Sequence, residues 1–373
     1  MSAVADIMAR LIPEPENVQV PADVLDEAKA AGAQSAAKDI QAKLAQALAP
    51  LKCAQDQYGE FVIEAHVGQR LEVLNIDSGA GEDAIRQVLK SATSKMPPKT
   101  FLDNTKAQLR IDARNANRQI TVFQRVARDG GAHIIDLGDP AGQIVRVENG
   151  SWQVTANTGI AFLRGRGYGA LPVPIRPSCP SEALKLLCRW ALRCGVPQHR
   201  ALMMIVALVT WLRTGNAYPL LLFYGPPGSG KSVAARFCLL LIDPPISLAL
   251  PNVGQDISDI AAAAQQRHVV SFDNASKLSG AFQDVLCTCA TGGEIMNRRY
   301  YKQGESIVLP IHRPVLITAV QPVVSRPDLM SRTIPIEFAQ LSARKAESAL
   351  LEDFLNQRPM LLGALIELLA VDT

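Results

Sequence analysis

Four short apolar runs in the second half of the chain have the length of buried β-strands. They cover residues 219–224, 268–273, 314–320 and 333–338. A short continuous apolar run that ends at polar or turn-forming residues is typical of a strand covered on both faces, as in a parallel sheet. The pattern therefore predicts an α/β core built on a parallel sheet.

Helical patterns surround these runs. Segments with helical spacing or composition lie at 181–194, 198–214, 233–241 and 342–370. The most apolar stretch, at 201–212, is flanked by Arg200 and Arg213 and is too short to cross a bilayer. We expect a buried helix there and no association with a membrane.

The first half of the chain has a different texture. Short strand patterns separated by turns occur at 61–67, 70–76, 133–137, 144–147 and 152–155, with a helix at 83–91. Residues 20–51 are rich in alanine, and 164–177 have the composition of a linker. These shifts predict an Ala-rich helical arm at 1–54, a separate mixed α+β domain at 55–177, the core at 178–340 and a helical lid at 341–373.

Composition narrows the class of protein only slightly. The chain has 373 residues, 48% of them hydrophobic, and a formal net charge of +3. Its seven cysteines form no Cys-x-x-Cys pair and no zinc-like set with histidine, and residues 1–15 do not resemble a secretion signal. We expect reduced thiols, a cytoplasmic location and more than one domain.

A glycine-rich loop directly follows the first apolar run of the core. It matches every fixed position of the phosphate-binding pattern G-x-x-x-x-G-K-[ST]. The loop consists of Gly225, Pro226, Pro227, Gly228, Ser229, Gly230, Lys231 and Ser232. Because a strand precedes it and a helix follows it, the motif is in the context that it requires. The alternative is a glycine-rich turn that binds nothing.

Each position of this loop has a physical reason for its residue type. Glycines allow successive backbone N–H groups to turn inward around an anion, and the following helix adds the positive end of its dipole. Lys231 is expected to reach the β- and γ-phosphates, and the Ser232 hydroxyl suits Mg²⁺. The predicted cofactors are therefore ATP and Mg²⁺.

The second apolar run ends in an acidic residue. Asp273 follows a short apolar stretch, which is the pattern by which a neighbouring strand presents a carboxylate to Mg²⁺. An aspartate that only caps a turn would give the same local pattern. The next residue, Asn274, can orient a water molecule but cannot act as a base, so the general base stays open.

A hairpin pattern lies between the second and third apolar runs. Residues 295–301 and 306–311 flank a polar turn that contains glycine. Arg298, Arg299 and Lys302 are placed to contact phosphates, and Tyr300 or Tyr301 to stack on a base. An ordinary solvated hairpin is the alternative reading.

The last two apolar runs carry further candidates. Thr318 places a hydroxyl near the end of the third run. Arg332 stands directly before the fourth run and Arg326 lies six residues earlier. Either arginine is suited to reach the nucleotide of a neighbouring subunit and stabilise charge there, with Arg332 the first choice. The alternative for both is a surface salt bridge.

A basic stripe is predicted in the first half of the chain. Lys106, Arg110, Arg114 and Arg118 recur every fourth residue, so on a helix they form a slowly turning row. Such a row can follow a phosphate backbone, and it is also what a solvated helix face looks like.

Together these motifs resemble an AAA+ ATPase of the helicase-like branch, near the superfamily 3 and minichromosome-maintenance helicases. The sequence is most similar to phage and mobile-element primase-helicase ATP-binding proteins. The resemblance spans about residues 60–368. It is carried by residues 135–140, Trp152, 218–219, 225–232, 242–244, 273–274, 290–293, 313–314 and 326–332.

This resemblance implies a hexameric ring that hydrolyses ATP between subunits and moves along DNA, single-stranded in the channel, with a possible primase or loader partner. It places Lys302 in the channel and makes Arg332 the residue that acts on the neighbouring site. Thr318 takes the sensor position where relatives commonly carry Asn, and Arg344 is the candidate from the lid. The resemblance favours DNA binding by the basic stripe over a solvated helix face.

Two classes of function stay open. The first is an ATP-driven replicative helicase of a phage or mobile element. The second is an oligomeric regulatory ATPase that loads or remodels a protein partner without unwinding DNA. A small-molecule kinase ranks third, since it would leave the hairpin and the arginines without a role.

Overall fold

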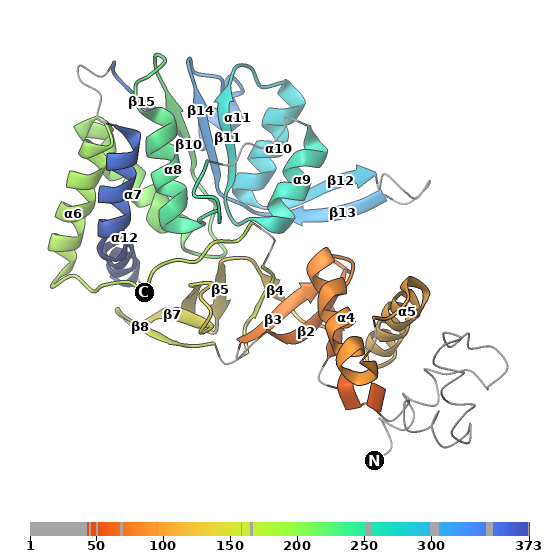
Figure 1. The fold of residues 1–373 in the computed structure, drawn as a ribbon. Helices are drawn as coiled ribbons and strands as arrows, with labels where there is room; N and C mark the ends of the chain where they lie inside the picture. Colours follow the sequence, from red (N-terminus) through yellow and green to blue (C-terminus); the bar gives the residue numbers. More distant parts are fainter. Residues whose placement is uncertain are drawn as a thin grey trace, which may run out of the picture. The chain divides into compact units, whose positions relative to one another are not determined.

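The computed structural model describes residues 43–44, 46–49, 51–67, 70–94, 96–157, 159–164, 167–250, 256–298, 306–340, 346–371 and 373. The chain divides into two compact units, Met1–Val122 and Phe123–Thr373. Figure 1 gives the order of the elements. Most of the predicted arm at 1–54 lies outside the described residues.

Unit 1 is a small antiparallel sheet covered by two helices. Its strands, in spatial order, are β1 (Lys52–Gln55), β2 (Phe61–Val67) and β3 (Arg70–Asn75), followed by α4 (Gly79–Thr93) and α5 (Lys99–Asn115). Ile63, Leu74, Ile85 and Leu102 meet in its core. The two strands predicted first, 61–67 and 70–76, are confirmed almost to the residue.

Unit 2 is built on a four-stranded parallel sheet. Its spatial order is β11 (Val270–Ala275), β14 (Val315–Ala319), β10 (Leu220–Tyr224) and β15 (Thr333–Glu337). All three neighbouring pairs are parallel, so the carboxyl ends of the four strands share one edge. This confirms the predicted α/β class and brings 225–232, Asp273 and Thr318 to the same side of the sheet.

Helices cover the sheet and extend beyond its β15 side. Their bounds are α6 (Pro180–Arg193), α7 (Gln198–Trp211), α8 (Lys231–Ile242), α9 (Ile257–Gln266), α10 (Gly280–Thr291), α11 (Pro327–Met330) and α12 (Glu347–Ala370). Figure 1 shows α6, α7 and α12 side by side. The predicted lid helix, α12, packs against α6, α7 and α8. It also lies close to the segment before α6, since a Cβ on Gly363 would be 1.8 Å from the Ile175 carbonyl oxygen.

A second sheet belongs to the same unit as the parallel sheet. It is antiparallel, with β5 (Val126–Asp129), β6 (Ala132–Asp136), β7 (Gln143–Glu148) and β8 (Ser151–Ala156) in that order. The short strands β4 (Val122–Phe123) and β9 (Ala161–Phe162) pair separately. The two units are divided at Val122/Phe123, not at the predicted position near residue 177.

Hydrophobic and polar contacts explain this division. Val145 and Trp152 share one core with Leu187 and Leu365 of the helices. The Trp152 indole Nε1 also donates to Glu367 of α12 at 2.8 Å. Composition alone does not reveal such contacts, because they join residues far apart in the chain.

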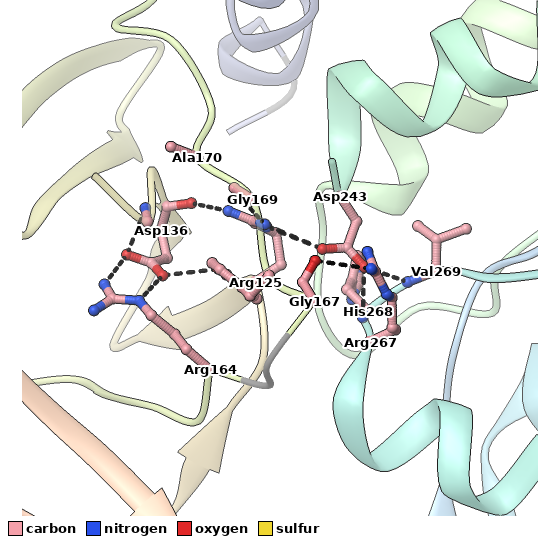
Figure 2. A network of polar contacts seen from close by, with 12 residues as sticks. Arg125, Asp136, Arg164, Gly167, Gly169, Ala170, Asp243, Arg267, His268 and Val269 are labelled. Carbon is pink, nitrogen blue, oxygen red and sulfur yellow. Dashed lines mark hydrogen bonds and ion pairs between the residues drawn. The ribbon is translucent and has the colours of Figure 1, made fainter. Parts of the chain in front are cut away.

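A buried polar junction joins the antiparallel sheet to the parallel one (Figure 2). Arg125 is fully buried and donates to the Asp243 carboxylate from Nε at 3.3 Å and from Nη2 at 3.2 Å. It also donates to the carbonyls of Asp136 and Gly169, and its guanidinium lies 3.5 Å from the ring centroid of Tyr168. The charge of Arg125 is therefore balanced inside the core by Asp243.

The predicted basic stripe turns toward unit 1 itself. Lys106 is buried and its Nζ lies 2.8 Å from Glu82 and 2.9 Å from Asp77. Arg110 pairs with the same Asp77, Arg118 donates to Glu64, and Arg114 lies over the Phe61 ring. These cations have partners within unit 1, which their spacing does not reveal, and Arg118 lies beyond the end of α5; their assignment to DNA stays a prediction.

We predict that Lys106→Met lowers the free energy of unfolding of unit 1 by about 1–3 kcal/mol at neutral pH, because two charge-assisted hydrogen bonds are lost. Hydrogen exchange of α4 and α5 amides in the full chain measures this. Lys99→Met, at the exposed start of α5, is the control and is expected to change stability by less than about 0.5 kcal/mol.

The same cluster makes the effect depend on pH. The hydrogen bond from Lys106 lowers the pKa of Glu82; for Asp77, hydrogen bonds from Lys106 and Arg110 outweigh partial burial and lower its pKa as well. A carboxyl with a lowered pKa stabilises the fold above its unfolded pKa of about 4, and this contribution is lost as pH falls through the lowered value. The difference between Lys106→Met and the unmodified chain should therefore shrink in acid. An equal difference at every pH would contradict this.

Candidate functional site

The glycine loop closes over the end of β10. Gly225 has φ 147°, and a Cβ there would lie 2.3 Å from the Phe338 carbonyl oxygen, so no other residue fits. Gly228 and Gly230 also have positive φ, and Gly230 caps α8 without a side-chain hydrogen bond. The first N–H groups of α8 therefore have no capping side chain, as in a site prepared for an anion.

Lys231 lies inside this loop. Its Nζ donates to the carbonyls of Gly225 at 2.9 Å and Pro226 at 2.8 Å, and lies 3.3 Å from Ser229 Oγ. Burial lowers the pKa of Lys231, and Asp273 acts in the opposite direction. The lysine is a buried cation whose hydrogen bonds go to neutral loop groups, so an anion entering the loop offers it a stronger partner.

Asp273 is joined to two other candidate residues. Its Oδ1 accepts hydrogen bonds from Ser232 Oγ at 2.9 Å and from Thr318 Oγ1 at 2.6 Å. Thr318 Oγ1 in turn accepts from the Asn274 N–H at 2.8 Å. The structure thus brings Ser232, Asp273, Asn274 and Thr318 together from α8 and the ends of β11 and β14.

The backbone at Asp273 and Asn274 departs from the regular sheet. The register with β14 shifts between Phe272 and Ala275, and Asn274 has a φ of 56°, which L residues rarely adopt. A bulge of this kind re-aims side chains at the end of a strand. The Thr318 hydroxyl holds both the carboxylate and the N–H that this bulge presents.

Ser232 and Asp273 fit the ligand set of Mg²⁺. Among the described residues, no group of three or more His, Cys, Asp or Glu side chains is placed to hold a metal ion. Mg²⁺ in a nucleotide site, however, takes one or two protein oxygens and completes its shell with water and phosphate. The adjacent Ser232 hydroxyl and Asp273 carboxylate supply that number.

A cavity of about 350 Å³ opens beside the loop. Tyr224 and Pro226 form one wall, and His199 and Arg200 at the start of α7 form another. Glu337 completes it from the end of β15, 3.4 Å from the Tyr224 hydroxyl. Pro226 belongs to the predicted loop, whereas Tyr224, His199, Arg200 and Glu337 were not predicted; their signal in the sequence was that two of the predicted strands end there.

The two candidate arginines lie away from the loop or are already paired. Arg332 precedes β15, and its carbonyl accepts from the N–H of Leu220 at the start of β10. It therefore stands at the opposite edge of the sheet from the glycine loop. Arg326 pairs with Asp284 at 2.8 Å, both half exposed, while the buried Gln283 holds its backbone N–H. Neither arginine is shown to serve the site of its own chain.

The predicted hairpin is confirmed up to its tip. Strands β12 (Gly293–Arg298) and β13 (Ser306–Ile311) are antiparallel, and Arg298 is paired in register with Ser306. Arg299, Lys302 and the lid candidate Arg344 lie outside the described residues. The assignments of Arg298, Arg299 and Lys302 to DNA stay predictions.

Comparison with known proteins gives one family. Residues 192–372 match the model described as actinomycete integrative conjugative element replication protein. The match begins near the end of α6, ends after α12, and includes the glycine loop, Asp273 and Thr318. This part of the chain is therefore similar to replication proteins of integrative conjugative elements. No curated protein matches the chain.

Two solved structures are among those that the chain matches. The apo C-terminal region of NrS-1 (305–718) has 13% identity and a TM-score of 0.41; the match covers 89% of this chain and 69% of that one. JCV helicase with a bound acetamide compound has 17% identity and a TM-score of 0.33, and the match covers 51% of this chain and 54% of that one.

No helix in the described part of the chain has the length and apolar character needed to span a membrane.

We predict that Thr318→Val lowers the free energy of unfolding by about 1–3 kcal/mol, because the Asn274 N–H and the Asp273 carboxylate lose the buried hydroxyl that they share. Denaturant unfolding measures the change. Thr318→Ser keeps the hydroxyl and is the matched control. A loss in Thr318→Ser with none in Thr318→Val would mean that packing of the Thr318 methyl, not its hydroxyl, is responsible.

Proposed function

We propose that this protein is an ATP-hydrolysing motor that acts on DNA during replication, in the manner of an AAA+ helicase. The observation that carries the proposal is the convergence of the 225–232 loop, Asp273 and Thr318 at one edge of a parallel sheet. The match of 192–372 to a replication protein family supports the link to DNA.

The residues of the site have distinct roles in this proposal. The loop N–H groups and the start of α8 bind the phosphates, and Lys231 leaves the Gly225 and Pro226 carbonyls to bind the β- and γ-phosphates. Ser232 and Asp273 would hold Mg²⁺, which neutralises charge as the phosphoryl group transfers. The cavity beside Tyr224 and Pro226 would receive the adenine ring of ATP.

Thr318 and Asn274 act on the side of the γ-phosphate. Thr318 keeps the Asp273 carboxylate turned toward Ser232 and keeps Asn274 in its left-handed conformation. Asn274 then stands beside the metal ligands, where its amide can orient the attacking water.

Assembly into a ring supplies the remaining charge. Arg332 lies at the sheet edge opposite the loop, where its own nucleotide is out of reach. In a ring of six subunits, Arg332, or Arg326 as second choice, completes the site of the neighbouring subunit. The basic hairpin tip with Arg298, Arg299 and Lys302 then faces single-stranded DNA.

A second candidate function has one observation in its favour. Lys106 and Arg118, two members of the expected DNA-binding row, are paired with carboxylates of unit 1 in the described residues. An oligomeric ATPase that loads or remodels a protein partner needs no such row. The response of hydrolysis to DNA separates the two functions.

We predict that the purified protein hydrolyses ATP in the presence of Mg²⁺ and that single-stranded DNA raises the rate. Lys231→Ala should reduce both rates by about 10²–10³, the usual cost of removing an electrostatic stabiliser of the transition state. Lys277→Ala, at an exposed position after β11, is the surface control and should leave both unchanged.

Two results would change the assignment. Full hydrolysis by Lys231→Ala would remove the site. Hydrolysis that no DNA stimulates, together with nucleotide-dependent assembly, would favour the loading or remodelling function.

We also predict that mixing two inactive variants restores activity. In a mixed ring, Lys231→Ala subunits still offer Arg332 to neighbours whose Lys231 is intact, so Arg332→Ala subunits regain working sites. Subunits of each variant are combined after dissociation and the ATPase rate is measured. No recovery with Arg332→Ala, but recovery with Arg326→Ala, would assign the role to Arg326; no recovery with either would contradict action between subunits.

A further inference from the structure

The helix and the strand that supply the metal-side residues are tied together at both ends. Ser232 lies in the first turn of α8 and Asp273 near the end of β11, and they are joined by the 2.9 Å hydrogen bond. At the other end, Asp243 directly follows α8, and its Oδ2 accepts from the N–H groups of His268 at 2.9 Å and Val269 at 3.2 Å. These two residues directly precede β11.

The hydrogen bonds of Asp243 link α8 directly to the start of β11, a strand that is not among the main packing partners of this helix. Helix α8 packs on β10 and β14, whereas β11 lies beyond β14 in the sheet. Only about 10 Å of extended chain separates Val270 from Asp273, so the position of the start of β11 affects the position of Asp273. The carboxylate of Asp243 opposes such a shift with two hydrogen bonds.

Asp243 is buried to 99%, and Arg125 supplies its counter-charge through Oδ1 (Figure 2). The two carboxylate oxygens therefore have separate tasks. Oδ1 balances charge with Arg125, and Oδ2 holds the start of β11. Removing Arg125 leaves Oδ1 without its counter-charge, but Oδ2 can still accept from the N–H groups of His268 and Val269.

We propose that Asp243 is a positioning residue for the metal side of the nucleotide site: it sets the position of Asp273 relative to Ser232. This inference rests on the proposed nucleotide site. Lys231 and the loop bind phosphate without β11, so Asp243 governs the gain in nucleotide affinity that Mg²⁺ provides, and not the affinity without metal.

The test compares two variants: one that loses stability but keeps the contact between Asp243 and β11, and one that loses this contact at a smaller cost in stability. Arg125→Met keeps the carboxylate on β11 but leaves it buried without a counter-charge, so it destabilises the protein. Arg125→Met with Asp243→Leu removes both charges, which spares the cost of a buried unpaired ion but removes the two hydrogen bonds from Asp243 to the start of β11. A purely structural role predicts that the single variant is the more damaged in binding.

The readout is ADP affinity by calorimetry, with Mg²⁺ and with EDTA. We expect the double variant to lose about tenfold or more of the Mg²⁺-dependent gain, as for other groups that orient metal ligands, and to keep its affinity in EDTA. The single variant should keep the gain. The double variant keeping the full gain would overturn the inference, whether or not the single variant folds.

Hydrogen exchange of the nucleotide-free protein gives a second readout. The His268 and Val269 amides should lose protection in the double variant, and equal protection in both proteins would also count against the inference. Failure of the proposed function is recognised separately, because the unmodified chain would then bind no ADP under either condition.

Discussion

The carboxylate of Asp243 is the constraint on which the arrangement of unit 2 depends. A buried carboxylate is stable only with a counter-charge and with its oxygens hydrogen-bonded, and the structure supplies both through Arg125 and the start of β11. Each partner comes from a different layer, one from the antiparallel sheet and one from the parallel sheet. A single charge at the end of α8 therefore fixes three elements, and the residues at the other end of that helix form the candidate site.

The same end of α8 explains why the antiparallel sheet is part of the core unit. Arg358 of α12 donates to the carbonyls of Leu240 and Ala170, which ties the last long helix to α8 and to the segment after the sheet. Burial lowers the pKa of Arg358 to about 10, and nearby Arg125 acts in the same direction. Arg125 and Arg358 thus both donate to groups at this end of α8, which links residues 123–177 and α12 to the helix.

The sequence predicts those features of the fold and the site that depend on local patterns. The glycine loop is a contiguous motif, and the parallel order of the strands follows from apolar runs separated by helices, so Asp273 and Thr318 were expected near Ser232. The features that the sequence does not predict depend on contacts between residues far apart in the chain. The spacing of Lys106 and Arg110 describes a face of α5 correctly, but nothing in it reveals that Asp77 and Glu82 cover that face. Arg118 lies beyond the end of α5 and pairs with Glu64. In the same way, His199 and Glu337 meet beside the loop only because α7 and β15 flank β10.

The proposed nucleotide binding requires Lys231 to change partners, because in this structure Lys231 donates to the carbonyls of its own loop. A crystal structure of the protein with Mg²⁺ and a non-hydrolysable ATP analogue tests it most directly. The account predicts phosphates within the 225–232 loop, Lys231 Nζ moved from Gly225 and Pro226 to the β- and γ-phosphates, and Mg²⁺ beside Ser232 and Asp273. A nucleotide bound elsewhere, or Lys231 still bonded to the loop carbonyls with the analogue present, would contradict it.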